Sequence, residues 1–150
     1  KPLMLVAGSV DDVSVYEAIR GIFDGTTGTD RHLLTFNNAN HNAAAPMAPP
    51  AEALAMTAKG ETGIYDHYAD AVWDNTRMNN ITQHFATAFM DTHLKANAEM
   101  ASYFDLVPAS VDGMNAVDDD GKPTAEHTYW EGFQPRTAVG LRFESKAKGE

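Results

Sequence analysis

Two short strand candidates separated by an amphipathic segment constrain the fold of this chain more than any other feature. Residues 3–7 form a continuous apolar run, typical of a strand covered on both faces, and residues 31–36 form a second strand candidate. Between them, apolar side chains recur at helical spacing at Tyr16, Ile19, Ile22 and Phe23. Ser14 and Glu17 have the spacing of a capping box, and residues 25–28 end the predicted helix. This order and spacing predict a βαβ unit with two parallel strands and a right-handed crossover.

The remaining sequence predicts helices and loops within one domain that spans residues 1–150. The predicted elements are a long loop at 37–63 with a short helical turn at 51–58, a long helix at 65–95, a shorter helix at 99–106, an acidic loop at 110–124 and a tail at 129–143 with a strand-like segment at 137–143. An apolar stripe at helical spacing supports the long helix, at Tyr68, Val72, Ile81, Phe85, Ala88 and Phe89. A chain of 150 residues is long enough to bury one core.

Composition narrows the classes of function. The formal net charge of −10 argues against a surface for nucleic acid or anionic membranes, because both need a basic patch. These residues contain no cysteine, so they can supply no disulfide, catalytic thiolate or cysteine-based zinc site. No apolar run approaches the ~20 residues that span a bilayer. We expect a soluble protein, and the sequence leaves open whether it is cytoplasmic or belongs to the bacterial envelope.

The residues that can carry chemistry follow the two strand candidates. Asp11 stands three residues after Gly8, which ends the first strand and permits a sharp turn, and His41 stands in the loop beyond the second strand. The carboxyl ends of neighbouring parallel strands meet at one edge of a sheet, so a carboxylate and an imidazole would meet there as two thirds of a hydrolytic triad. Asp12 could supply the carboxylate instead, and both aspartates could simply occupy a turn. His41 alone could be an ordinary loop histidine, but its pairing with Asp11 favours catalysis.

Other polar residues point to structural roles. His32 lies at the start of the second strand, on the opposite edge of the predicted sheet from Asp11. Arg77, Asn80 and His84 share one face of the long helix. These three side chains could contact the active-site loops or a substrate, but we favour a polar network that holds the helix in place.

The sequence does not indicate a metal site or a cofactor site. A metal-dependent enzyme would require several histidines to converge without a ligand-like spacing, among His32, His67, His84, His93 and His127. The acidic loop at 112–121 lacks the alternating oxygen ligands and the terminal glutamate of a helix–loop–helix calcium site. We assign four aromatic residues to the core or to docking of the tail: Trp73, Tyr129, Trp130 and Phe133. We therefore expect no metal or organic cofactor.

Four segments give the chain a resemblance to a known family. Residues 3–13 (LMLVAGSVDDV) and 32–42 (HLLTFNNANHN) resemble the last third of an α/β-hydrolase, whose triad follows the order Ser, Asp, His. Residues 72–85 (VWDNTRMNNITQHF) and 130–141 (WEGFQPRTAVGL) resemble the terminal helix and tail of bacterial predicted dienelactone hydrolases. The resemblance covers nearly the whole chain. It implies an α/β fold, the C-terminal portion of an α/β-hydrolase with an incomplete sheet, in which Asp11 is the triad acid and His41 the general base.

The nucleophile of such a triad has no counterpart in these residues. No Gly-x-Ser-x-Gly occurs, and the family's nucleophile elbow and oxyanion hole precede this region. The resemblance implies a serine- or cysteine-type hydrolase of carboxylic ester or lactone bonds, acting on a small molecule. Two parallel strands alone would leave unpaired edges, so this portion would need the N-terminal part of its own fold and would be inactive alone. The alternative is a non-catalytic hydrolase-like fragment that serves as a binding or assembly module.

Overall fold

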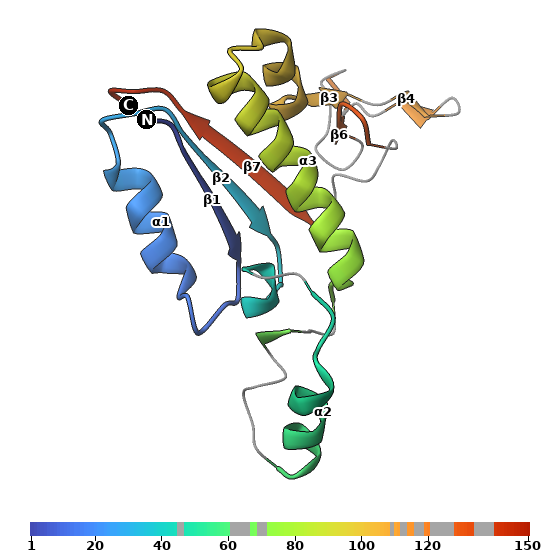
Figure 1. Ribbon diagram of the computed structural model, residues 1–150. Helices are drawn as coiled ribbons and strands as arrows, with labels where there is room; N and C mark the ends of the chain where they lie inside the picture. The colour runs from blue at the N-terminus through green and yellow to red at the C-terminus, as the bar shows by residue number, and fades with distance from the viewer. Residues whose placement is uncertain are drawn as a thin grey trace. The chain divides into compact units, whose positions relative to one another are not determined.

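The computed structural model divides the chain into two compact units (Figure 1). One unit comprises Lys1–His84 and Arg142–Glu150, and the other comprises Phe85–Leu141. The structure describes residues 1–44, 47–60, 67–68, 72–108, 110–111, 114–115, 119–120, 128–133 and 140–150. Within this described part, no helix is both long enough and apolar enough to cross a membrane.

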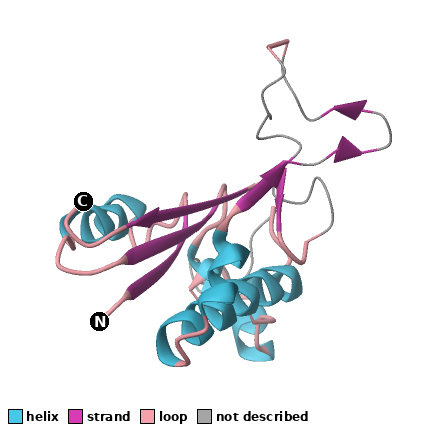
Figure 2. Cartoon of the chain, turned by 90° about the horizontal axis from the view of Figure 1, so that it is seen from above, coloured by secondary structure: helices cyan, strands magenta, loops and turns pink. Residues whose placement is uncertain are grey.

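A three-stranded sheet forms the centre of the first unit. Its order is β1 (Leu3–Gly8), β2 (Arg31–Phe36) and β7 (Leu141–Lys146). β1 and β2 are parallel and in register from Leu3 opposite Arg31 to Gly8 opposite Phe36, which confirms the predicted parallel pair. β7 runs in the opposite direction along the other side of β2, and the three strands lie side by side in both views (Figures 1 and 2). The class is therefore α/β with a mixed, open sheet.

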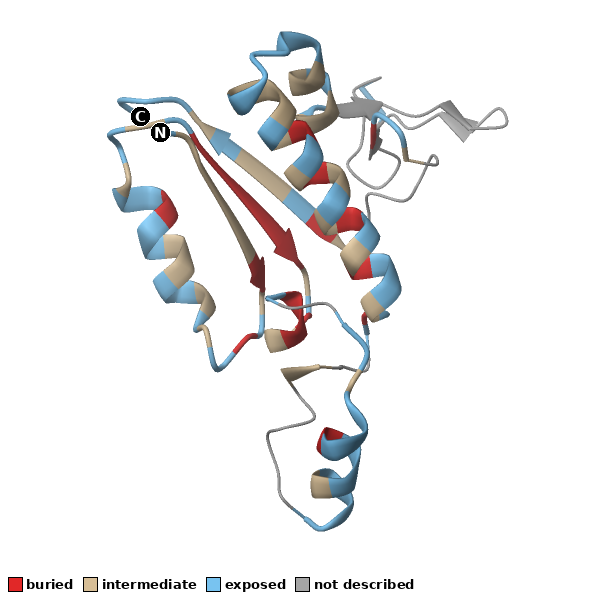
Figure 3. Cartoon of the chain, in the orientation of Figure 1, coloured by how far each residue is buried: buried red, intermediate tan, exposed pale blue. Residues whose placement is uncertain are grey.

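Burial distinguishes the central strand from the edge strand. Every residue of β2 is buried, whereas β1 is half-buried until its last two residues, Ala7 and Gly8 (Figure 3). Among the described residues, no strand pairs with the outer edge of β1. The sheet is thus complete around β2 and open beside β1.

Helix α1 (Tyr16–Gly25) packs on the sheet through Tyr16, Ile19 and Phe23 of the predicted apolar face, whereas Ile22, which was assigned to the same face, is exposed. Phe23 forms a buried cluster with Ala7 of β1 and Leu33 of β2, and partly buried side chains, Tyr16 and Ile19 among them, pack against this cluster. The predicted capping box is wrong. Val15 occupies the N-cap position and no side chain caps the helix. Ser14 belongs to the preceding turn instead, where its backbone N–H donates to Asp11.

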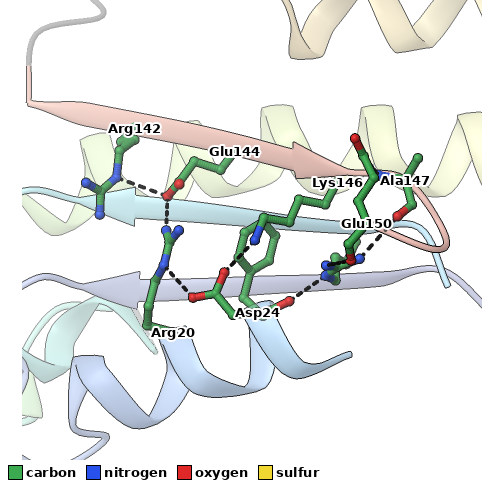
Figure 4. A network of polar contacts seen from close by, with 9 residues as sticks. Arg20, Asp24, Arg142, Glu144, Lys146, Ala147 and Glu150 are labelled. Carbon is green, nitrogen blue, oxygen red and sulfur yellow. Dashed lines mark hydrogen bonds and ion pairs between the residues drawn. The ribbon is translucent and has the colours of Figure 1, made fainter. Parts of the chain in front are cut away.

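A network of ion pairs joins α1 to β7 (Figure 4). Arg20 contacts Glu144 at 2.5 Å and Asp24 at 3.2 Å, and Lys146 contacts Asp24 at 2.6 Å. Arg142 adds a contact to Glu144 at 3.1 Å. The hydrogen bond from Lys146, with the nearby Arg20 charge, holds the pKa of Asp24 below its ordinary value. The hydrogen bond to Glu144 likewise raises the pKa of the Arg20 guanidinium. These contacts fix the helix along the antiparallel strand.

Arg31, at the start of β2, is fully buried and binds the backbone of three residues. Its Nε donates to the carbonyl oxygen of Phe23 at 2.5 Å, its Nη1 to Ala147 at 3.2 Å and its Nη2 to Glu150 at 2.6 Å. Lys148 N also donates to Asp30 Oδ1 at 2.9 Å. The segment after β7 is thereby held against the amino end of the sheet.

Three helical elements follow β2 in the sequence. They are the 3₁₀ turn η1 (His41–Ala43), α2 (Ala51–Ala58), which matches the predicted helical turn, and α3 (Asn75–Leu94). The predicted start of the long helix at residue 65 is wrong where the structure describes the chain, since Val72 is exposed and precedes the helix. Asp74 begins α3 because its Oδ1 accepts the N–H of Arg77 at 2.8 Å. Residues 65–66 and 69–71 of the predicted helix lie outside the described residues.

The second unit contains an aromatic cluster and several short strands. Phe85 and Trp130 are buried in edge-to-face contact with ring centroids 5.3 Å apart, and Phe133 lies 6.2 Å from Phe85. Phe85 and Trp130 are therefore core, as predicted for Trp130, and half-buried Phe133 packs beside them. The unit contains η3 (Ala98–Phe104), the antiparallel pair β3 (Leu106–Pro108) and β6 (Thr128–Trp130), and the antiparallel pair β4 (Ser110–Val111) and β5 (Met114–Asn115).

Several sequence predictions for the second unit need correction. The helix predicted at 99–106 is a 3₁₀ helix that ends at Phe104, after which Leu106 opens β3. The acidic region predicted as a loop begins with the β4–β5 pair, because a short hairpin satisfies backbone groups there. The strand predicted at 137–143 begins at Leu141. Outside the described residues lie 112–113, 116–118, 121–127 and 134–139.

Candidate active site

Asp11 and His41 meet at the carboxyl end of the β1–β2 pair. Nδ1 of His41 lies 3.0 Å from Oδ2 and 3.2 Å from Oδ1 of Asp11. The Asp11 side chain is 2% exposed and the His41 side chain 22%. A buried carboxylate thus contacts an imidazole that solvent still reaches.

Local backbone groups hold the Asp11 carboxylate in a fixed orientation. Its Oδ1 accepts the N–H groups of Val13 and Ser14, each at 2.9 Å. The backbone N–H of Asp11 returns to the carbonyl oxygen of Gly8 at 3.3 Å, which closes the turn after β1. Asp11 therefore lies in a turn, which was one of the two roles expected for it, and from that turn it also contacts His41.

Gly8 allows the loop that carries His41 to approach the end of β1. A Cβ atom at Gly8 would fall well inside van der Waals contact with the backbone oxygens of Ala39 and Asn40. The absence of a side chain at Gly8 therefore lets the two backbone segments come close together. This close approach permits the hydrogen bond from Val10 N to the carbonyl oxygen of Ala39 at 3.0 Å.

Asparagines shape the loop between β2 and His41. Asn38 has a φ of 62°, a left-handed conformation that asparagine tolerates better than most residues, and its N–H donates to Ser9 Oγ at 2.8 Å. Asn40 is the N-cap of η1, where its Oδ1 accepts the N–H of Asn42 at 3.1 Å. The histidine is therefore the first residue of a capped helical turn that is bonded to the end of β1.

The other side of this loop is fixed by the segment that leads into α3. Buried Asn42 donates from Nδ2 to Asn75 Oδ1 at 3.0 Å and contacts Met78 Sδ at 3.3 Å. Trp73 donates from Nε1 to the carbonyl oxygen of Asn37 at 2.8 Å and packs edge-on against Phe36, with ring centroids 5.1 Å apart. The His41 loop is thus anchored to β1 on one side and to the start of α3 on the other.

This arrangement determines which nitrogen of His41 can react. A carboxylate only accepts hydrogen bonds, so Nδ1 of His41 must carry a proton toward Asp11. In the neutral ring, Nε2 then presents a lone pair, and within the described residues Nε2 has no hydrogen-bond partner. A general base needs this combination: one nitrogen held and the other available.

The structure separates Asp11 and His41 from the competing candidates. Asp12 is exposed, and the described contacts of His41 Nδ1 are to Asp11. His32 lies at the opposite end of β2, where its Nδ1 lies 2.8 Å from Ser145 Oγ and its ring stacks on Phe143. This placement agrees with the position expected for His32.

The polar face expected on the long helix is described in part. Arg77 lies over the ring of buried Trp73, with its guanidinium carbon 5.0 Å from the ring centroid. This stacking agrees with a structural role for Arg77. Asn80 is exposed and His84 is half-buried.

Two neighbours of the Asp11–His41 pair were not assigned to this site from the sequence: His67 and Asn75. The ring of His67 lies edge-to-face against His41 with centroids 5.0 Å apart. His67 and Asn75 carry no local signal, because their contacts depend on segments far apart in the sequence.

Metal binding is not supported by the part of the chain that the structure describes. No group of three or more histidine, aspartate or glutamate residues there has an arrangement that could hold a metal ion. His127 and residues 112–113, 116–118 and 121 of the acidic loop lie outside the described residues.

Comparisons with known proteins give no match. No family model matches the chain, and searches of curated proteins and of solved structures also find none.

Proposed function

We propose that this chain is the acid- and base-bearing part of an α/β-hydrolase, similar to the bacterial predicted dienelactone hydrolases, that cleaves carboxylic ester or lactone bonds. One observation carries the proposal: the buried Asp11 carboxylate lies 3.0 Å from Nδ1 of a partly exposed His41 at the carboxyl end of two parallel strands. The order of aspartate before histidine and the resemblance of residues 3–13 and 32–42 to the family support the same assignment.

In the proposed reaction, His41 transfers protons and Asp11 orients it. Nε2 of His41 accepts the proton of a serine or cysteine side chain as that side chain attacks the ester carbonyl. The proton is then given to the leaving alkoxide, which departs and leaves an acyl-enzyme. Water repeats the cycle and releases the acid. Asp11 keeps the proton on Nδ1 and stabilises the charged ring formed at each step.

The nucleophile in this proposal lies outside the 150 residues, since they contain no Gly-x-Ser-x-Gly and no cysteine. In the proposal, a larger sheet continues at the open edge of β1. The half-buried side chains of β1 are consistent with further chain packing beside this strand. Reading the coding sequence before Lys1 tests this directly: a strand followed by Gly-x-Ser-x-Gly or Gly-x-Cys-x-Gly is expected.

The kinetic test uses the full-length protein and short-chain aryl esters. His41→Ala should remove nearly all turnover while the protein stays folded, and should lower the free energy of unfolding by about 1–3 kcal/mol because the buried Asp11 carboxylate loses one partner. Asp11→Asn should lower kcat by as much as roughly 10⁴-fold, because the amide favours the wrong tautomer. Asp12→Asn is the matched control and should leave kcat unchanged.

Three outcomes would overturn the assignment in whole or in part. Unchanged turnover in His41→Ala would remove the histidine from the reaction. A larger loss in Asp12→Asn than in Asp11→Asn would transfer the acid role. If the full-length protein cleaves none of these esters, the alternative of a binding or assembly module takes its place.

A further inference from the structure

We infer that His67 is a positioning residue for His41, held in place by Asn75; this inference rests on the proposed function. The rings of His67 and His41 lie with their centroids 5.0 Å apart and their planes inclined by 67°. Both residues belong to the same compact unit. Asp11 fixes one edge of the His41 ring, and His67 lies against the same ring as a second, independent constraint.

Asn75 joins the segment that carries His67 to the loop that carries His41. Its Nδ2 donates to the carbonyl oxygen of Tyr68, the residue after His67, and to that of Met47 at 2.6 Å. Its Oδ1 accepts from Nδ2 of Asn42, the residue after His41, at 3.0 Å. One side chain at the start of α3 thus bonds to the neighbours of both histidines.

The consequence for the proposed reaction is control of the His41 ring plane. The hydrogen bond at Nδ1 leaves the ring able to tilt about the axis of that bond, and such a tilt moves Nε2 away from a nucleophile. A ring packed edge-to-face restricts the tilt and covers part of the imidazole surface. Proton transfer depends steeply on this geometry, so a lost constraint affects the chemical step more than substrate binding.

The contact itself is tested by NMR of the full-length protein with labelled histidines. His67→Ala should shift the His41 Hε1 resonance by removing the ring current of its neighbour, and His67→Phe should retain a ring-current shift. Asn75→Ala should also shift this resonance, because the anchor of Tyr68 is lost. His93→Ala is the matched control: this histidine also has an edge-to-face aromatic neighbour, Phe89 at 4.8 Å, but belongs to the other compact unit.

The role is tested by kinetics on the same variants. His67→Ala should lower kcat by roughly tenfold with KM changed less than about twofold, and His67→Phe should restore most of the loss. The effects of His67→Ala and Asn75→Ala should be less than additive in the double variant, since both act through one contact. His93→Ala should change neither kcat nor KM.

The results separate the two proposals. An unchanged His41 spectrum in His67→Ala overturns the inference whether or not the protein hydrolyses esters. A shifted spectrum with unchanged kcat in an active protein also overturns it. Absence of ester hydrolysis by the wild-type protein, together with a shifted spectrum, overturns the proposed function and leaves the contact between the two histidines established.

Discussion

The two ends of the β1–β2 pair both bury an ionisable side chain, but they satisfy it differently. At the amino end, Arg31 is fully buried and all three of its described bonds go to backbone carbonyl oxygens. At the carboxyl end, Asp11 is buried against His41, which is partly exposed and still offers Nε2. A buried ion surrounded by the chain's own backbone stabilises the fold, whereas one joined to a titratable, solvent-reachable partner can take part in a reaction.

The two histidines at opposite ends of β2 differ in the same way. His32 near the start of β2 is 8% exposed, bonded to Ser145 and stacked on Phe143. His41 just beyond the end of β2 is bonded to a carboxylate. The same side chain therefore serves packing at one end and, in our proposal, proton transfer at the other.

The largest effect should come from the amino end. Arg31→Met removes a fully buried guanidinium together with its bonds to three backbone oxygens, of which only that of Phe23 is in a buried bond, and should lower the free energy of unfolding by roughly 3 kcal/mol, since a bond from a charged donor contributes about 1.5–3 kcal/mol. Urea unfolding measures the change. Arg77→Met is the control, because it removes only an exposed stacking contact on Trp73, worth about 0.5–1 kcal/mol. Equal losses in the two variants would contradict the structural role of Arg31.

A smaller effect is expected at the carboxyl end. Gly8→Ala places a methyl group against the backbone of Ala39 and Asn40, and this overpacking should cost about 1–3 kcal/mol and displace His41. Gly21→Ala is the matched control, since Gly21 lies inside α1 with open space around it, and that variant should gain up to about 1 kcal/mol. Urea unfolding compares them, and equal stability of the two variants would refute the close approach at Gly8.

The smallest effect should come from the ion pairs between α1 and β7. The pKa of Asp24 is lowered from 3.8 in the folded protein, so its contribution is fully present above that value and is lost as the pH falls through the lower folded pKa. The stability difference between wild type and Asp24→Asn should therefore shrink on acidification below about pH 4. Unfolding curves across this range measure it, with exposed Asp12→Asn as the control. A difference that grows on acidification would reverse the sign and exclude the mechanism.

The sequence predicted the elements whose periodicity is local. The apolar run of β1, the amphipathic face of α1 and the limits of β2 all follow from neighbouring residues, and so does the parallel pairing that brings Asp11 to His41. The helical turn at α2 was also predicted with its observed limits.

What could not be predicted depends on distant contacts. β7 pairs with β2 across most of the chain, and no local pattern indicates that partner. The start of α3 was misplaced because the apolar spacing continues through Tyr68 and Val72, whereas Asp74 begins the helix and Trp73 is bonded to Asn37. The contact between His41 and His67 likewise depends on a loop whose path the sequence does not indicate.

The position of β7 has a consequence for how the chain folds during synthesis. β1, α1 and β2 can associate once about the first quarter of these residues has emerged, whereas two of the acceptors of Arg31 lie 116 and 119 residues after it. Closing so long a loop is entropically costly, so the amino end of the sheet closes late and its guanidinium stays hydrated until then. The Asp11–His41 contact spans only 30 residues, so we expect it to form with the early β1–α1–β2 contacts. We therefore expect Asp11 and His41 to come together before the segment after β7 binds Arg31 at the amino end of the sheet.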